Sequence, residues 1–226
     1  MEETILQLMH VTGKKQRNGF QITDVTMQLR EGYIYAIAGE NGAGKTTLLE
    51  LIGREDSRYT GNMIFDGMYL KAEHAKAMET IGIISEDCLF FEDRNGKENA
   101  AILGDFYENY EKERFFSYCK RFQVPLCTSY INLSRGEKIK WQICFAAARH
   151  CRLYMLDEAT AGMDPVFRKV FFDLLHEIMA QTKACILMTD HNLHEISRQT
   201  DYVAYMENGR LSSWKESMEV EADVWI

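Results

Sequence analysis

The chain has 226 residues and a formal net charge of −8, from 26 Lys and Arg against 34 Asp and Glu. This acidic balance argues against a general nucleic-acid binder, and the length with 46% hydrophobic residues predicts one large domain, or one domain with a lobe. Six cysteines without a C-x-x-C pair favour free, mostly buried thiols over disulfides or a zinc site.

The N-terminal part of the chain is predicted to be rich in β-structure. Residues 22–29 alternate between apolar and polar side chains, which is typical of a strand with one buried face. The further elements expected here are a buried strand at 33–38, a helix from Lys45 to about Ile52, a hairpin at Asp66-Gly67 and a short strand at 81–84.

Residues 93–150 differ in character, because strand-like runs disappear and aromatic residues recur at helical spacings of 3, 4 and 5. These aromatic residues are Tyr107, Tyr110, Phe115, Tyr118 and Phe122. We interpret them as the core of a helical lobe rather than as a groove for a partner.

After residue 150 the alternation of strands and helices returns. The elements expected there are a strand at 153–156, a helix at 166–179, a strand at 184–189 and a hairpin formed by 202–206 with Asn208-Gly209. The pattern therefore predicts a single α/β domain over 1–226, with a parallel-sheet core made by 1–92 and 151–226 and a helical lobe inserted at 93–150.

The strongest chemical signal is the segment from Gly39 to Thr46, which has the P-loop spacing of Gly, four residues, Gly, Lys and Thr. A predicted buried strand precedes it and a predicted helix follows, so its backbone N–H groups can surround phosphates. Lys45 would bridge the β- and γ-phosphates, and the Thr46 hydroxyl would bind Mg²⁺. The nucleotide-binding candidates here are Gly39, Glu40, Asn41, Gly42, Ala43, Gly44, Lys45, Thr46 and Thr47.

A second acidic segment supports a phosphoryl-transfer site. The apolar run 153–156 ends in Asp157 and Glu158. Asp157 would help to hold Mg²⁺ through water, and Glu158 could orient or deprotonate the attacking water. An ordinary strand end remains the alternative interpretation.

Leu133-Ser134-Arg135-Gly136-Glu137, shortly before that strand, resembles the LSGGQ motif of the ATP-binding-cassette (ABC) ATPases, with Arg135 and Glu137 as departures. The resemblance implies that Ser134 and the Gly136 amide face the γ-phosphate bound to an opposite subunit. Ser134 with Glu137 also fits a helix capping box, and both interpretations can hold together.

The order of later motifs is similar to that of the same family. Ala161-Gly162-Met163-Asp164 resembles its D-loop, and Asp190-His191 follows a predicted strand as the family's switch histidine does. The resemblance implies that His191 contacts the γ-phosphate and helps to hold Glu158 and the water, so Glu158 and His191 are the catalytic candidates.

The sequence departs from the family pattern at two places in the site. Lys14, Lys15 or Gln16 stands where an aromatic residue usually stacks on adenine, and Phe20 is a poorly placed substitute. Glu86 stands where a glutamine usually touches Mg²⁺ and water, so it either ligates the metal with Thr46 and Asp157 or faces solvent. A third departure, Ala159 in place of the usual proline, has no clear chemical consequence.

The resemblance covers residues 5–212 and implies a P-loop ABC nucleotide-binding fold, with a RecA-like parallel-sheet core, an N-terminal antiparallel β portion and an inserted helical lobe. It also implies an Mg-ATP-binding and ATP-hydrolysing subunit that dimerises head to tail, as a homodimer or a heterodimer, and powers a separate membrane-spanning permease. Glu98-Asn99-Ala100 and the surrounding sequence resemble ATPases of Gram-positive ABC-2-type exporters, and the groove near Glu86 to Arg94 would contact the permease. No apolar run could span a bilayer and no signal peptide is recognisable, so we expect a cytoplasmic protein at the inner membrane face. The alternatives are a soluble ABC ATPase without transport and a signalling subunit with degenerate catalysis.

Overall fold

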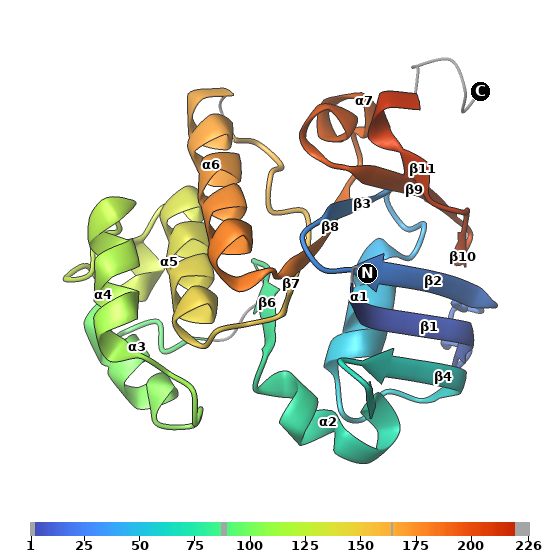
Figure 1. The fold of residues 1–226 in the computed structure, drawn as a ribbon, viewed down its shortest axis with the longest axis horizontal. Coiled ribbons are helices and arrows are strands. Elements are labelled where there is room, and N and C mark those ends of the chain that lie inside the picture. The colour runs from blue at the N-terminus through green and yellow to red at the C-terminus, as the bar shows by residue number, and fades with distance from the viewer. Residues whose placement is uncertain (1–2, 87–89, 164, 220–226) are drawn as a thin grey trace.

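The computed structural model describes residues 3–86, 90–163 and 165–219, with two sheets and a group of helices to one side (Figure 1). The larger sheet has the strand order β10-β9-β3-β8-β7-β6, with β11 also paired to β9. Its strands are β3 (Ile34–Ala38), β6 (Ile81–Ile84), β7 (Leu153–Leu156), β8 (Cys185–Asp190), β9 (Tyr202–Glu207), β10 (Arg210–Leu211) and β11 (Lys215–Glu216). Strands β6, β7, β8, β3 and β9 run parallel, and β10 and β11 pair antiparallel to β9.

The smaller sheet is antiparallel and is formed mainly by the N-terminal part of the chain. Its order is β2-β1-β4-β5, with β1 (Thr4–Gly13), β2 (Val25–Arg30), β4 (Tyr59–Phe65) and β5 (Met68–Tyr69). The hairpin expected at Asp66-Gly67 is confirmed. Both residues have positive φ, 46° and 77°, as a type I′ turn requires. The predicted fold class, a parallel core with an antiparallel portion and an added helical lobe, is therefore confirmed.

The helices are α1 (Lys45–Gly53), α2 (Leu70–Met78), α3 (Gly96–Gly104), α4 (Lys112–Arg121), α5 (Arg135–Ala148), α6 (Pro165–Thr182) and α7 (Leu193–Ile196), with short 3₁₀ turns at Tyr130–Asn132, Ser197–Gln199 and Ser217–Glu219. Sequence analysis did not anticipate α2, which is interrupted by a non-helical Glu73 at φ −127°. Helices α3, α4 and α5 lie between the predicted lobe boundaries, and the boundaries themselves stay a prediction.

Buried strands divide their side chains between two cores. In β3, Ala36 and Ala38 pack with the helical lobe and α6, whereas Tyr35 and Ile37 pack with α1 and the antiparallel sheet. This division follows from the two-residue period of a strand that is covered on both faces. Strand β2 instead alternates buried and exposed residues, because only one of its faces is covered.

The cysteines that the structure describes are free thiols, as predicted. Cys119, Cys144, Cys151 and Cys185 are buried and Cys127 is exposed, while Cys88 lies outside the described residues. Burial raises the pKa of the Cys151 thiol to about 11, because the thiolate would lose its hydration.

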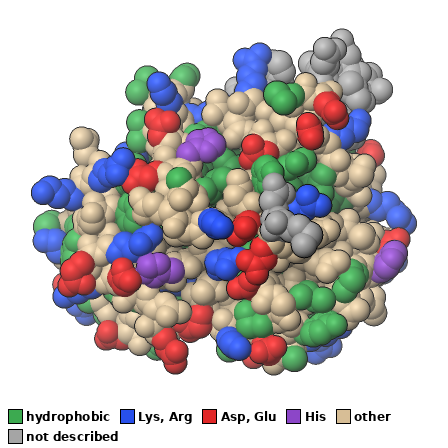
Figure 2. All heavy atoms as spheres, viewed as in Figure 1, with side chains coloured by type: hydrophobic (Ala, Val, Ile, Leu, Met, Phe, Trp, Pro, Cys, Tyr) green, Lys and Arg blue, Asp and Glu red, His purple; other side chains and the backbone are tan. Residues whose placement is uncertain are grey.

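The face of the molecule drawn in Figure 2 carries interspersed basic and acidic side chains, with no continuous basic patch. This agrees with the net charge. None of the helices in the described part of the chain has the length and apolar character needed to cross a lipid bilayer.

The buried Arg149 fastens the end of the lobe to the core. Its Nη2 donates to the carbonyl oxygens of Met78, Glu79 and Ile81 at 2.6, 3.2 and 3.0 Å, and its guanidinium lies 3.6 Å from the centre of the Tyr107 ring. Only 5% of the residue is exposed. One cation therefore satisfies three carbonyl groups at the junction of α2 and β6.

We predict that Arg149→Ala lowers the free energy of unfolding by about 2 to 4 kcal/mol, because three carbonyl groups lose a charged donor. Equilibrium urea denaturation measures the change. Arg121→Ala is the matched control: Arg121 is 63% exposed and pairs with Glu177 at the surface, so its loss should cost less than about 1 kcal/mol. Equal effects of the two substitutions would contradict this role for Arg149.

Candidate functional site

The P-loop joins β3 to α1 and folds around its own lysine. Lys45 is 4% exposed, and its Nζ donates to the carbonyl oxygens of Gly39 at 2.8 Å and Glu40 at 3.1 Å. A Cβ atom on Gly39 would lie 2.4 Å from the Met206 carbonyl oxygen, and Gly44 has φ +114°. The sequence therefore needs glycine at these positions for the backbone to curl closely enough to present its N–H groups.

A cavity of about 420 Å³ lies over this loop. It is lined by Gln16, Asn18, Phe20, Asn41, Gly42, Gly44, Lys45, Thr46, Thr47 and Glu158. The structure thus brings together most of the predicted phosphate-binding residues and the predicted catalytic glutamate. The cavity lining also includes Gln16, Asn18 and Phe20, from the segment that the family resemblance places near adenine.

Asp157 and Glu158 are fixed at the end of β7 by the neighbouring strand β8. The Thr189 hydroxyl donates to Asp157 Oδ1 at 2.6 Å and accepts the Glu158 N–H at 3.0 Å. Glu158 adopts a left-handed backbone, φ +45°, and its Oε1 lies 3.6 Å from Lys45 Nζ. The end of β7 and the P-loop are therefore in contact through the oppositely charged side chains of Glu158 and Lys45.

His191 follows β8, as predicted, but does not line the P-loop cavity. Its side chain is 53% exposed, with Nδ1 3.7 Å from Asp190 Oδ1. Asp190 is buried, and it accepts the Thr160 hydroxyl at 2.5 Å and the Asn192 N–H at 2.7 Å. No role was predicted for Asp190 itself. Its position, a carboxylate at the end of a buried strand, could have indicated that it belongs to the site.

Ser134 caps α5, which confirms the capping-box interpretation. Its Oγ accepts the Glu137 N–H at 3.3 Å, and Glu137 Oε2 accepts both the Ser134 N–H and hydroxyl at 2.8 Å. Neither Ser134 nor Gly136 lines the P-loop cavity of this chain. Their expected role at a second subunit's nucleotide stays a prediction. Asp164 of the D-loop-like segment lies outside the described residues.

The structure places the two departures Glu86 and Arg135 against each other. Arg135 Nε contacts Glu86 Oε1, while its two terminal nitrogens donate to the Ala161 carbonyl oxygen at 2.6 Å and the Glu158 carbonyl oxygen at 3.0 Å. The Glu86 side chain is 60% exposed and also pairs with Arg135, whereas the sequence indicated metal ligation or solvent exposure and did not indicate this ion pair.

The segment expected near adenine is divided between two cavities. Lys14 and Lys15 line a neighbouring cavity of about 570 Å³, and Gln16 lines both. Phe20 lies in the P-loop cavity, where its ring Cζ would be 2.6 Å from a Cβ atom on Gly44. Phe20 therefore lines the same cavity as Lys45, and its placement relative to the adenine base stays a prediction.

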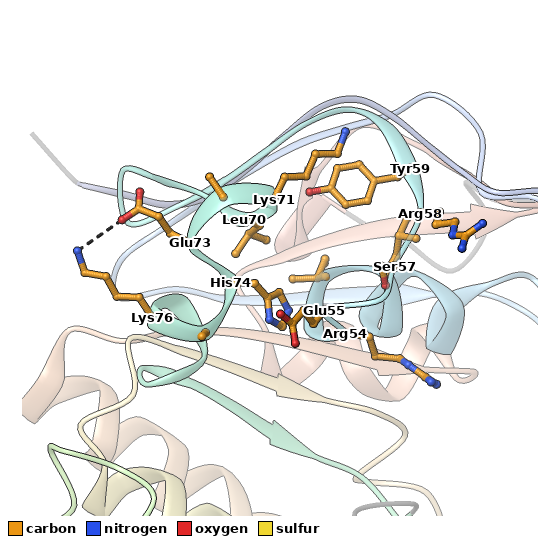
Figure 3. Close-up of a pocket in the computed structure, with 14 residues that line it drawn as sticks. Arg54, Glu55, Ser57, Arg58, Tyr59, Leu70, Lys71, Glu73, His74 and Lys76 are labelled. Carbon is orange, nitrogen blue, oxygen red and sulfur yellow. Dashed lines mark ion pairs between the residues drawn. The ribbon is translucent and has the colours of Figure 1, made fainter.

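A larger cavity, of about 830 Å³, lies between α1, β4 and α2 and holds none of the predicted site residues (Figure 3). Two of its charged side chains form local ion pairs: Lys76 lies 3.6 Å from Glu73, and Arg54 pairs with Glu50 and Asp56. Among the residues that the structure describes, no three His, Cys, Asp or Glu side chains cluster as a metal site. Any metal at the P-loop would therefore depend on phosphate and water oxygens for most of its ligands.

Comparison with known proteins finds similarity to ATP-binding proteins of transporters. ABC transporter ATP-binding protein YtrB of Bacillus subtilis (strain 168) is 29% identical over 192 residues, covering 85% of this chain and 65% of that protein. Methionine import ATP-binding protein MetN of Geobacillus kaustophilus (strain HTA426) is 28% identical over 208 residues, covering 88% of this chain and 61% of that protein. The chain thus spans less than two thirds of the length of either relative.

Solved structures show the same fold. An ATP-binding subunit of an ABC transporter superposes with a TM-score of 0.82 at 25% identity, covering 94% of this chain and 90% of that one. CbiO1 from Clostridium perfringens, part of the ABC transporter complex cbiONQ, superposes with a TM-score of 0.80 at 24% identity, covering 98% and 92%. The family model described as ABC transporter matches residues 22–161. Because that match covers more than half of the sequence, this chain belongs to the ABC transporter family.

Proposed function

We propose that the chain is the ATP-binding and ATP-hydrolysing subunit of a transporter, acting with a separate membrane-spanning permease at the inner face of the membrane. The observation that carries this proposal is the buried Lys45, held within the P-loop and 3.6 Å from Glu158 across one cavity. A cation among the backbone N–H groups of a P-loop is suited to a polyphosphate. A carboxylate at the same place is suited to activating water.

In this proposal the P-loop N–H groups and Lys45 hold the β- and γ-phosphates. The Thr46 hydroxyl and Asp157 would hold Mg²⁺, which supplies neutralisation of phosphate charge. Glu158 accepts the proton of the attacking water. His191, which follows β8, contacts the γ-phosphate and helps to hold Glu158 and the water. Phe20 packs against the adenosine part of the nucleotide in place of the usual aromatic residue.

The position of Ser134 and Gly136 supports a head-to-tail dimer. Both residues lie at the N-terminus of α5 and outside their own chain's P-loop cavity. The N-terminus of a helix favours an anion, because its backbone N–H groups and the positive end of the helix dipole lie there. Each chain then supplies half of two nucleotide sites, with its P-loop in one and Ser134 in the other.

A groove between the core and the lobe supports docking of the permease. It has a volume of about 210 Å³ and is lined mainly by apolar residues, among them Ile83 of β6, Leu103 of α3, Phe145 of α5 and Phe90 before α3. Ile83 is 37% exposed, and Phe91, which follows Phe90 next to this lining, is 47% exposed. We propose that an amphipathic helix of the permease occupies this groove. The exporter-like sequence around Glu98-Asn99-Ala100 supports export as the direction.

Two variants should separate the two ends of the nucleotide. Lys45→Ala should weaken binding of both ATP and inorganic triphosphate at least about tenfold, because both need the phosphate-facing cation. Phe20→Ala should weaken ATP about tenfold and leave triphosphate unchanged, because an aromatic contact is lost at the base end. Isothermal titration calorimetry measures both, with Lys15→Ala as the control cation outside the cavity. Unchanged ATP affinity in Lys45→Ala would refute the P-loop assignment.

Glu158→Gln tests the proposed chemistry. The amide keeps the shape of the side chain but cannot take a proton, so turnover in the assembled transporter should fall by about 100-fold or more. ATP should still bind, and sizing chromatography should show more dimer with Mg-ATP than with ADP. Turnover equal to that of the wild type would exclude Glu158 as the catalytic base.

The groove is tested by Phe91→Asp, which places a charge beside its apolar lining. We expect loss of co-purification with the polytopic membrane protein from the native host, while Phe106→Asp, at a 74% exposed position beyond α3, should retain it. If the wild-type chain co-purifies with no membrane protein, a soluble ABC ATPase without transport is the better description.

A further inference from the structure

Arg135 joins three segments that are distant in sequence. It begins α5 in the lobe, Glu86 follows β6 where the chain passes toward the lobe, and the Glu158 to Ala161 loop follows β7. The guanidinium contacts Glu86 with one nitrogen and donates to the Glu158 and Ala161 carbonyl oxygens with the other two. One side chain therefore connects the lobe to the loop from Glu158 to Ala161, here called the acid loop, and to the segment at Glu86 that follows β6.

Glu86 and Arg135 carry opposite charges and lie against each other. The Asp157 N–H donates to the Ile84 carbonyl oxygen at 2.9 Å, so Glu86, two residues after Ile84, stands beside the acid strand. A third carboxylate next to Asp157 and Glu158 would add negative charge where an anionic nucleotide is expected to bind. The Arg135 guanidinium offsets that charge and gives the Glu86 carboxylate an oppositely charged partner.

Arg135 also completes the restraint of Glu158. The Glu158 N–H is held by Thr189, its carboxylate faces Lys45, and its carbonyl oxygen accepts from Arg135. Glu158 is an L residue at φ +45°, a conformation that persists only where surrounding contacts hold it. Loss of the Arg135 contact would leave this carbonyl oxygen with the Ala161 N–H at 3.1 Å but without its charged donor.

We propose that Arg135 is a positioning residue for Glu158 and that Glu86 holds Arg135 in place, so that the two form an intrasubunit latch, the Glu86–Arg135 latch, on the acid loop. The latch deepens the proposed function, since its catalytic consequence rests on Glu158 activating water. Neither side chain lines the P-loop cavity, so the latch acts on turnover rather than on ATP affinity. Glu86 then serves an arginine and not the metal.

The first test measures the loop directly and does not depend on catalysis. The Ala161 N–H donates to the Glu158 carbonyl oxygen at 3.1 Å, so its hydrogen exchange, followed by NMR in the full chain, reports the loop. Arg135→Ala and Glu86→Gln should each speed this exchange by about tenfold. Lys138→Ala, which removes a cation of the same helix that lies over Tyr130, should leave it unchanged. The amide of the buried Leu187 in β8 reports whether the fold is intact.

The second test separates positioning from binding. In the assembled transporter, Arg135→Ala and Glu86→Gln should lower turnover about fivefold while ATP affinity changes less than about twofold. The double variant should be no slower than Arg135→Ala, because both changes break one contact network. Arg135→Lys should recover part of the loss, because it keeps the charge against Glu86 without the fork that reaches both carbonyl groups. If Arg135→Ala does not fold, Arg135→Lys is used for the same two measurements.

The outcomes are distinct. Unchanged Ala161 exchange in both Arg135 variants would overturn the latch. Faster exchange in Arg135→Ala but not in Glu86→Gln would remove Glu86 from it. A raised Mg²⁺ requirement in Glu86→Gln with unchanged exchange would identify Glu86 as a metal ligand instead. Absence of ATP turnover in the wild-type complex would contradict the proposed function, and the exchange measurement would still decide the latch.

Discussion

The parallel pairing of β3, β7 and β8 is the constraint on which the site depends. Ala38 pairs with Asp190 and Leu156 pairs with Met188, so the three strands end at one edge of the sheet. The segments that leave those strands, the P-loop, the acid loop and the His191 turn, must therefore emerge side by side. Residues separated by more than 100 positions in the chain lie close together there because the strands pair, and their side chains need no direct contact to be brought together.

The loops at this edge of the sheet adopt backbone conformations that few residue types can adopt. Gly44 and Glu158 both have positive φ, and Gly39 approaches the Met206 carbonyl too closely for any larger residue. The loops so formed aim N–H groups and carbonyl oxygens at a small volume, where Lys45 is already satisfied by two carbonyl groups. The strained positions lie where a phosphate and a water would have to be held, which is the usual place for such strain.

The helical lobe is joined to the core by arginine contacts at two places along α5 and just beyond it. Arg135, at the start of the helix, reaches the acid loop and Glu86, whereas Arg149, just past its end, is buried against the junction of α2 and β6. Both bond to backbone carbonyl oxygens, which the planar guanidinium can do with several donors at once.

The sequence by itself determined the local features. The P-loop, the strand that ends at Asp157, the Ser134 cap and the hairpin turns at Asp66-Gly67 and Asn208-Gly209 are each specified by a few adjacent residues. Hydrophobic period and glycine position are enough for these, because their geometry depends on neighbours along the chain. Only the tertiary structure decided that Glu86 faces Arg135, that Phe20 enters the P-loop cavity and that Lys14 and Lys15 do not. Those contacts join segments whose separation is set by how the lobe and the N-terminal sheet pack on the core, and no local pattern encodes that packing.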